Sequence, residues 1–162
     1  MKTRILLTDR QRTHGIDPDR LQSAISSIAA ELWPGSVEIS VTLLGRRAMA
    51  AANRAYRGTL GPTDQISFPM PSDLPTADGV TLVGDLLICP AVIADQCRTP
   101  PPDGRTATGT PDRELALVLC HGLLHLQGHT HAGADDTVAM IAAEKRLLAA
   151  HVSALAGAYV LP

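Results

Sequence analysis

Hydrophobic and polar residues alternate most clearly over residues 37–43, where the sequence reads VEISVTL. A period of two is typical of a strand that buries one face and leaves the other half-exposed. Shorter apolar runs over residues 4–8, 66–68 and 80–89 predict three further strands. The pattern therefore predicts a small sheet of about four strands.

Apolar residues spaced three or four positions apart predict the helices. The clearest such run lies over residues 18–32 and consists of Leu21, Ile25, Ile28 and Leu32. Asp17 and Pro18 stand where an N-cap and a first helical residue are expected. Further helices are predicted over residues 46–56, 91–97, 115–126 and 135–151, the last with Val138, Ile141 and Leu148 facing inward. About five helices mixed with about four strands indicate an α/β (α+β) fold, in which a small mixed sheet packs against helices.

The length of 162 residues is that of one domain, which we expect to span residues 1–162. No apolar run approaches the ~20 residues of a membrane-spanning helix, so no membrane partner is expected. Residues 98–111 hold four prolines, four threonines and two glycines, which predicts a flexible internal surface loop.

Charge is distributed unevenly although the formal net charge is only −2. Residues 1–60 carry nine basic and five acidic side chains, and residues 61–162 carry five and eleven. The basic half contains a cluster within twelve residues, formed by Arg46, Arg47, Arg54 and Arg57. Such a cluster could bind phosphates, and a solvated helix face is an equal alternative.

The cysteines and aromatic residues narrow the range of functions. Cys89, Cys97 and Cys120 are odd in number and lack metal-type spacing, which argues against a disulfide framework and fits a reducing cytoplasm. Aromatic residues make up 2 % of the chain, too few for a stacking platform on single-stranded nucleic acid.

Four of the six histidines lie within residues 121–131, whose sequence is HGLLHLQGHTH. On a helix, His121 and His125 share one face with Cβ atoms ~5–6 Å apart, so both imidazoles can bind one metal ion. Gly128 lets the chain leave the helix and turn back, which can bring His131 to the same ion. Three histidines leave a fourth position for water, as in catalytic zinc sites, although nickel, copper and iron also bind imidazole.

Other interpretations of this segment stay open. His129 could replace His131 as the third ligand, and two buried helical histidines followed by a polar turn need hold no metal at all. The spacing H-x3-H-x2-G-x2-H also occurs in metzincin proteases, where a glutamate general base follows the first histidine. Here that position is Gly122, which cannot accept a proton, and this argues against a peptidase.

The histidine segment resembles the signature H-G-x-L-H-L-x-G-[aromatic]-D-H of the YbeY family, the bacterial rRNA-maturation endoribonucleases. Two further family blocks, N-x-x-Y-R-G and P-T-D-V-L-S-F-P, resemble residues 53–58 and 62–69, and G-D-I-x-I-C resembles residues 84–89. The family's later Met and Glu resemble Met140 and Glu144. These blocks occur in the family's order and cover most of residues 50–145. The signature's aspartate is replaced by Thr130, which carries no charge.

This resemblance implies a zinc-dependent endoribonuclease that is specific for single strands. It implies action in small-subunit rRNA 3′-end maturation and late ribosome quality control in the cytoplasm. The implied cofactor is one Zn²⁺ per chain, held by His121, His125 and His131, and the implied partners are the rRNA precursor and the small ribosomal subunit. No DNA substrate is expected. A metal ion at such a site lowers the pKa of a bound water toward ~7, and that water would hydrolyse the phosphodiester.

Arg57 is the candidate catalytic residue, because it lies in the block NRAYRG and its guanidinium can bind a phosphate through two hydrogen bonds. A structural ion pair with Asp64 or Asp85 is the alternative. Two other functions stay open for the whole chain. One is a ribosome-assembly factor whose metal is mainly structural, and the other is a metallohydrolase that acts on another substrate.

Overall fold

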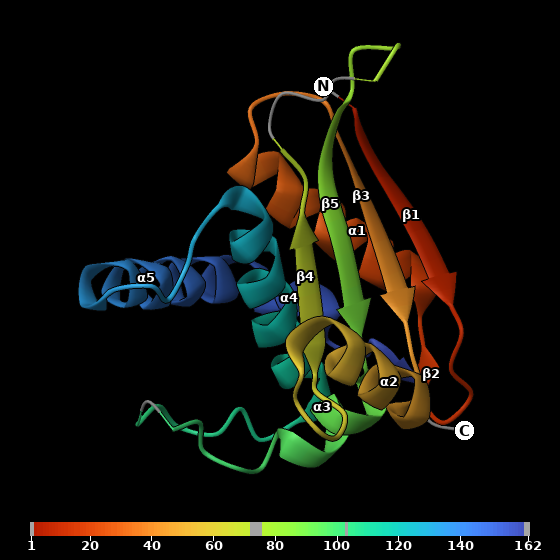
Figure 1. Cartoon of the computed structure of the whole chain (residues 1–162), viewed down its shortest axis with the longest axis vertical. Coiled ribbons are helices and arrows are strands. Elements are labelled where there is room, and N and C mark those ends of the chain that lie inside the picture. The colour runs from red at the N-terminus through yellow and green to blue at the C-terminus, as the bar shows by residue number, and fades with distance from the viewer. Residues whose placement is uncertain (1, 72–75, 103, 161–162) are drawn as a thin grey trace.

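The computed structural model describes residues 2–71, 76–102 and 104–160 of the chain (Figure 1). Its strands are β1 (Thr3–Asp9), β2 (Gly15–Ile16), β3 (Val37–Leu43), β4 (Gln65–Pro69), β5 (Thr81–Ile88) and β6 (Tyr159–Val160). Its α-helices are α1 (Pro18–Leu32), α2 (Arg46–Arg57), α3 (Pro90–Gln96), α4 (Pro111–Gln127) and α5 (Ala134–His151), followed by the short 3₁₀ helix η1 (Val152–Leu155). No helix in these ranges is both long and apolar enough to cross a membrane.

Four strands form a mixed sheet in the order β1-β3-β5-β4. The first three run parallel, and β4 pairs with β5 in the antiparallel sense. This sheet and the five α-helices confirm the predicted fold class. The strands β2 and β6 pair separately, Gly15 with Val160 and Ile16 with Tyr159. That ribbon was not predicted, because two-residue strands are too short to show a hydrophobic period.

The core lies between one face of the sheet and the helices α1, α4 and α5. Strand β3 buries each of its alternate apolar residues, as its period of two predicts. The same apolar cluster takes in the buried sides of α1, α4 and α5, so these helices share one face of the sheet. Figure 1 shows α1 behind the strands, and α2 and α3 at the end where β3 and β5 finish.

Two sequence-based expectations about the helices are corrected. Helix α4 begins at Pro111 instead of residue 115, because Thr110 caps it by accepting from the Arg113 backbone N–H at 3.4 Å. The described residues between 98 and 110 hold no helix or strand, and residue 103 lies outside the described part of the chain. Val138 is 68 % exposed, so its predicted inward direction is wrong. The buried stripe of α5 consists of Met140, Glu144 and Leu147.

Gly84 allows β4, β5 and α4 to pack closely. Its φ is +143°, and a Cβ there would lie 2.3 Å from the carbonyl oxygen of Phe68 and 2.8 Å from Cδ2 of Leu126. Only glycine fits such a contact and backbone conformation without displacement. The close approach brings β4, with its polar residues Gln65 and Ser67, against α4.

Candidate metal centre

Helix α4 and the turn after it bring three histidines together. The Nε2 atoms of His121 and His125 lie 2.9 Å apart on adjacent turns. Gly128 caps α4 with φ +109°, a value that glycine adopts readily, and the chain then turns back. The ring of His131 consequently lies 5.3 Å from that of His121 and 5.2 Å from that of His125, between centroids. One ligand nitrogen from each histidine lies within 4.8 Å of the others.

Hydrogen bonds fix which nitrogens are available to a metal. The Nδ1 of His125 lies 2.9 Å from the carbonyl oxygen of His129, and the Nδ1 of His121 contacts the carboxylate of Glu144. Because both partners can only accept, each Nδ1 carries a proton, and in the neutral form of each ring Nε2 is the nitrogen left for a metal ion. Two Nε2 atoms that face each other at 2.9 Å need a proton or a metal ion between them. The donor set therefore fits a metal ion.

The protonation of His125 favours the same conclusion. Burial lowers the pKa of this imidazole, and the neighbouring His121 and His131 lower it further. His125 is therefore neutral at physiological pH, which is the form that binds metals.

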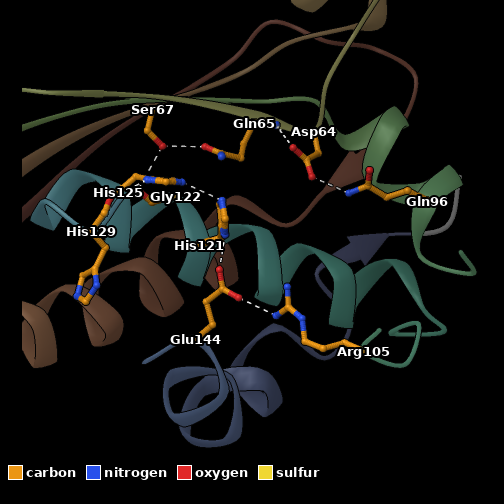
Figure 2. Close-up of polar contacts among 10 residues, drawn as sticks. All are labelled: Asp64, Gln65, Ser67, Gln96, Arg105, His121, Gly122, His125, His129 and Glu144. Carbon is orange, nitrogen blue, oxygen red and sulfur yellow. Dashed lines mark hydrogen bonds and ion pairs between the residues drawn. The ribbon is translucent and has the colours of Figure 1, made fainter. Parts of the chain in front are cut away.

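Glu144 contacts His121 at Nδ1, whereas His125 faces the Nε2 of the same ring. Its side chain is 1 % exposed, with one oxygen on His121 and the other 2.7 Å from Nη1 of Arg105 (Figure 2). Burial alone would raise the pKa of this carboxyl group, but the contacts with His121 and Arg105 outweigh burial and lower it. The carboxylate is therefore ionised and fixes the orientation of the His121 ring.

Neither His129, the alternative third ligand, nor Cys120, which directly precedes His121, joins the histidine group. His129 contributes its backbone carbonyl to His125, and its ring is not among the grouped nitrogens, so the third member is His131. Cys120 is buried, and burial raises the pKa of its thiol to about 12. A neutral thiol that faces the core is a poor metal ligand.

Two hollows of about 380 Å³ and 660 Å³ meet beside His121. Arg57, Gln65 and His121 line both of them. Arg57 is the last residue of α2 and is exposed, and its guanidinium has no hydrogen-bond or ion-pair partner among residues 2–71, 76–102 and 104–160. The alternative of an ion pair with Asp64 or Asp85 is therefore not seen.

Asp64 does not pair with Arg57 and instead belongs to a hydrogen-bond network beside the smaller hollow. It accepts hydrogen bonds from the backbone N–H of Gln65 at 2.6 Å and from the Gln96 amide at 2.7 Å. Gln96 also donates to Glu114 at 3.0 Å. These hydrogen bonds link residues that line the smaller hollow and hold them in place.

Sequence reasoning missed the roles of Arg105, Gln96 and Gln65 at this site. Gln96 reaches it from the end of α3 and Arg105 from the loop before α4, and no spacing connects them with the histidines. Gln65 did carry a signal, because the resembling family block has valine at its position.

A family model described as Endoribonuclease YbeY matches residues 6–151. This chain belongs to the YbeY family. Its relatives include the endoribonuclease YbeY of Cutibacterium acnes, 37 % identical over 119 residues, which are 71 % of this chain and 72 % of that protein. The endoribonuclease YbeY of Mycobacterium tuberculosis is 37 % identical over 128 residues, 75 % of this chain and 68 % of that protein.

A solved structure supports the fold independently. The solution structure of a Thermotoga maritima protein superposes with a TM-score of 0.60 at 23 % identity, covering 94 % of this chain and 89 % of that one. Membership in the YbeY family confirms the resemblance found in the sequence and the expected enzyme class, an endoribonuclease and hence a hydrolase. In this YbeY protein the three-histidine group could hold the metal ion.

Proposed function

We propose that this protein is a zinc-dependent endoribonuclease that cleaves single-stranded RNA. Its place would be small-subunit rRNA 3′-end maturation and late ribosome quality control in the cytoplasm, with the rRNA precursor and the small ribosomal subunit as partners. One observation carries the proposal. The Nε2 atoms of His121 and His125 face each other at 2.9 Å with His131 close by, and the Arg57 guanidinium, which has no ion-pair partner among the described residues, lines the same hollow.

His121, His125 and His131 would hold the zinc ion. When bound, the ion supplies Lewis-acid activation of a water molecule and of a phosphoryl oxygen. Glu144 and the His129 carbonyl keep the two helical imidazoles in the ligating tautomer, so the site is oriented before the metal arrives.

Arg57 would bind the phosphate that is cleaved. Hydrolysis of a phosphodiester increases negative charge on the phosphoryl oxygens, which a fixed cation stabilises. The Arg57 guanidinium is available for this role because no carboxylate in the described residues neutralises it. A flexible single strand can place one phosphate in such a hollow more easily than a stiff duplex can.

The test measures cleavage of single-stranded RNA and zinc content in the same preparation. We expect zinc-dependent cleavage that His125→Ala abolishes together with zinc binding, which also excludes a contaminating nuclease. Full zinc occupancy without RNA cleavage would support the assembly-factor function instead. Cleavage of a different ester but not of RNA would support the other metallohydrolase.

Arg57→Ala tests the phosphate role separately. We expect kcat/KM to fall about 10²–10³-fold while zinc content stays unchanged, because one transition-state contact is lost. The matched control is Arg54→Ala, which removes an exposed arginine of the same helix that lines neither hollow at the histidines. Equal activity of the two variants would contradict a catalytic role for Arg57.

A further inference from the structure

Gln65 is a buried polar side chain at the junction of the two hollows. It is the first residue of β4 and is 8 % exposed. Together with Arg57 and His121 it lines both hollows. An RNA strand that passes from one hollow to the other must therefore pass this amide.

A hydrogen bond from Ser67 fixes the orientation of the Gln65 amide. The hydroxyl of Ser67 donates to Oε1 of Gln65 at 2.8 Å and lies 3.3 Å from the carbonyl oxygen of Gly122 (Figure 2). Because Oε1 is engaged by Ser67, the Nε2 group lies at the other end of the amide.

The Nε2 group is a donor without a partner in the part of the chain that the structure describes. Nε2 of Gln65 is not among the fully enclosed side-chain atoms without a partner in the described residues, as Oδ1 of Asn53 is, so it is accessible from the hollows that Gln65 lines. A reachable donor held in a buried frame is suited to an anionic oxygen.

Gly122 lets this amide sit directly on the helix that carries the metal ligands. A Cβ at position 122 would lie 3.2 Å from Oε1 of Gln65 and 3.0 Å from Cδ2 of Leu86. Glycine therefore makes room for the amide beside His121. A phosphate bound between the histidines and Arg57 would lie beside the same amide, because Arg57, Gln65 and His121 line both hollows.

We propose that Gln65 is a catalytic residue whose Nε2 donates a hydrogen bond to a non-bridging oxygen of the scissile phosphate. This inference rests on the proposed function, cleavage of single-stranded RNA. Negative charge on that oxygen increases in the transition state, so the hydrogen bond strengthens as the reaction proceeds. The amide needs no reorganisation, because Ser67, which also contacts the Gly122 carbonyl, already holds it.

Gln65→Met, which keeps the length of the side chain and removes the donor, tests the proposal on zinc-loaded protein. We expect kcat for single-stranded RNA to fall about 10- to 100-fold with KM changed less than threefold. Zinc content and Tm stay unchanged. The matched control is Gln127→Met, which removes an amide from α4 that is bound to the Leu32 carbonyl and lines neither hollow at the junction. Its kcat stays at the wild-type value.

Gln65→Glu keeps the proposal testable if the methionine variant folds poorly. Glutamate retains the acceptor for Ser67 but replaces the donor by a negative charge, so its kcat falls further than that of Gln65→Met. A phosphorothioate RNA gives a readout that a merely structural role would not move. Sulfur in place of the bonded oxygen slows wild type, and this loss disappears in Gln65→Met.

The outcomes separate the two claims. Wild-type protein that is fully zinc-loaded and does not cleave RNA overturns the proposed function and this inference with it. Wild-type cleavage with kcat of both Gln65 variants within twofold of wild type overturns the inference alone. An unchanged phosphorothioate effect in Gln65→Met does so as well.

Discussion

Two glutamates in this protein have the same kinds of partner in very different surroundings. Glu144, beneath the metal centre, contacts His121 and lies 2.7 Å from Arg105. Glu31, at the surface, lies 2.8 Å from His151 and 3.9 Å from Arg146. Glu144 is 1 % exposed and Glu31 36 %.

The difference shows that burial, more than partner type, decides what such a contact does. At the surface, water screens the charges, and an exposed ion pair contributes ~0–1 kcal/mol. Around Glu144 little water competes, and each carboxylate oxygen is bound by a different partner. Glu144 can therefore fix a ring that binds metal, whereas the more exposed Glu31 holds the half-buried His151 and the exposed Arg146 only loosely.

The largest expected effect comes from Glu144→Gln. Glutamine keeps the size but loses the charge that orients His121 and balances Arg105, so zinc affinity falls about 10- to 100-fold. Competition with a chromophoric chelator measures the dissociation constant. The matched control is Glu31→Gln, which changes the exposed pair and leaves zinc affinity within twofold. Similar losses in both variants would mean that burial does not distinguish the two contacts.

The histidine centre was predictable from the sequence because its geometry is local. The spacing of four residues on a helix and a glycine after it place His121, His125 and His131, and no distant contact is needed. Glu144 was noticed only through the family resemblance. Its contact with His121 depends on how α5 packs against α4, which no spacing encodes.

The fold, like the site, was predicted correctly where the sequence pattern is local and wrongly where the outcome depends on distant contacts. Strand β3 was predicted correctly from its alternating apolar residues, and helix α1 from its N-cap. Both signals lie in or directly beside the element that they predict. The inward face of α5 was predicted wrongly at Val138 because apolar residues occur on more than one side of this helix, and a charged residue, Glu144, occupies the buried stripe. The contacts with His121 and Arg105, both on other segments of the chain, make that burial favourable.

A smaller effect is expected from Arg105→Met. Removing the guanidinium leaves Glu144 with His121 as its remaining partner here, so the carboxylate is held less firmly and zinc affinity falls about five- to tenfold. Arg146→Met, which changes the arginine near Glu31, is the control and leaves zinc affinity unchanged. Isothermal titration of both variants with zinc gives the comparison. A loss for Arg105→Met as large as that for Glu144→Gln would show that the arginine, not the carboxylate, positions the ring.

The smallest effect concerns the third histidine. His131 is exposed and has no hydrogen-bond partner within the described ranges, and its neighbour Thr130 is uncharged. The Oγ1 of Thr130 accepts from the Ala132 backbone N–H at 3.4 Å, a bond that an aspartate side chain can also accept. Thr130→Asp therefore keeps the turn and adds a carboxylate beside a metal ligand.

Because solvent screens the new charge, zinc affinity rises only about two- to threefold. Thr130→Asn, which has the same shape without charge, separates electrostatics from turn geometry and leaves the affinity unchanged. If Asp and Asn variants bind zinc equally, a carboxylate at this exposed position does not act as Glu144 does in the core.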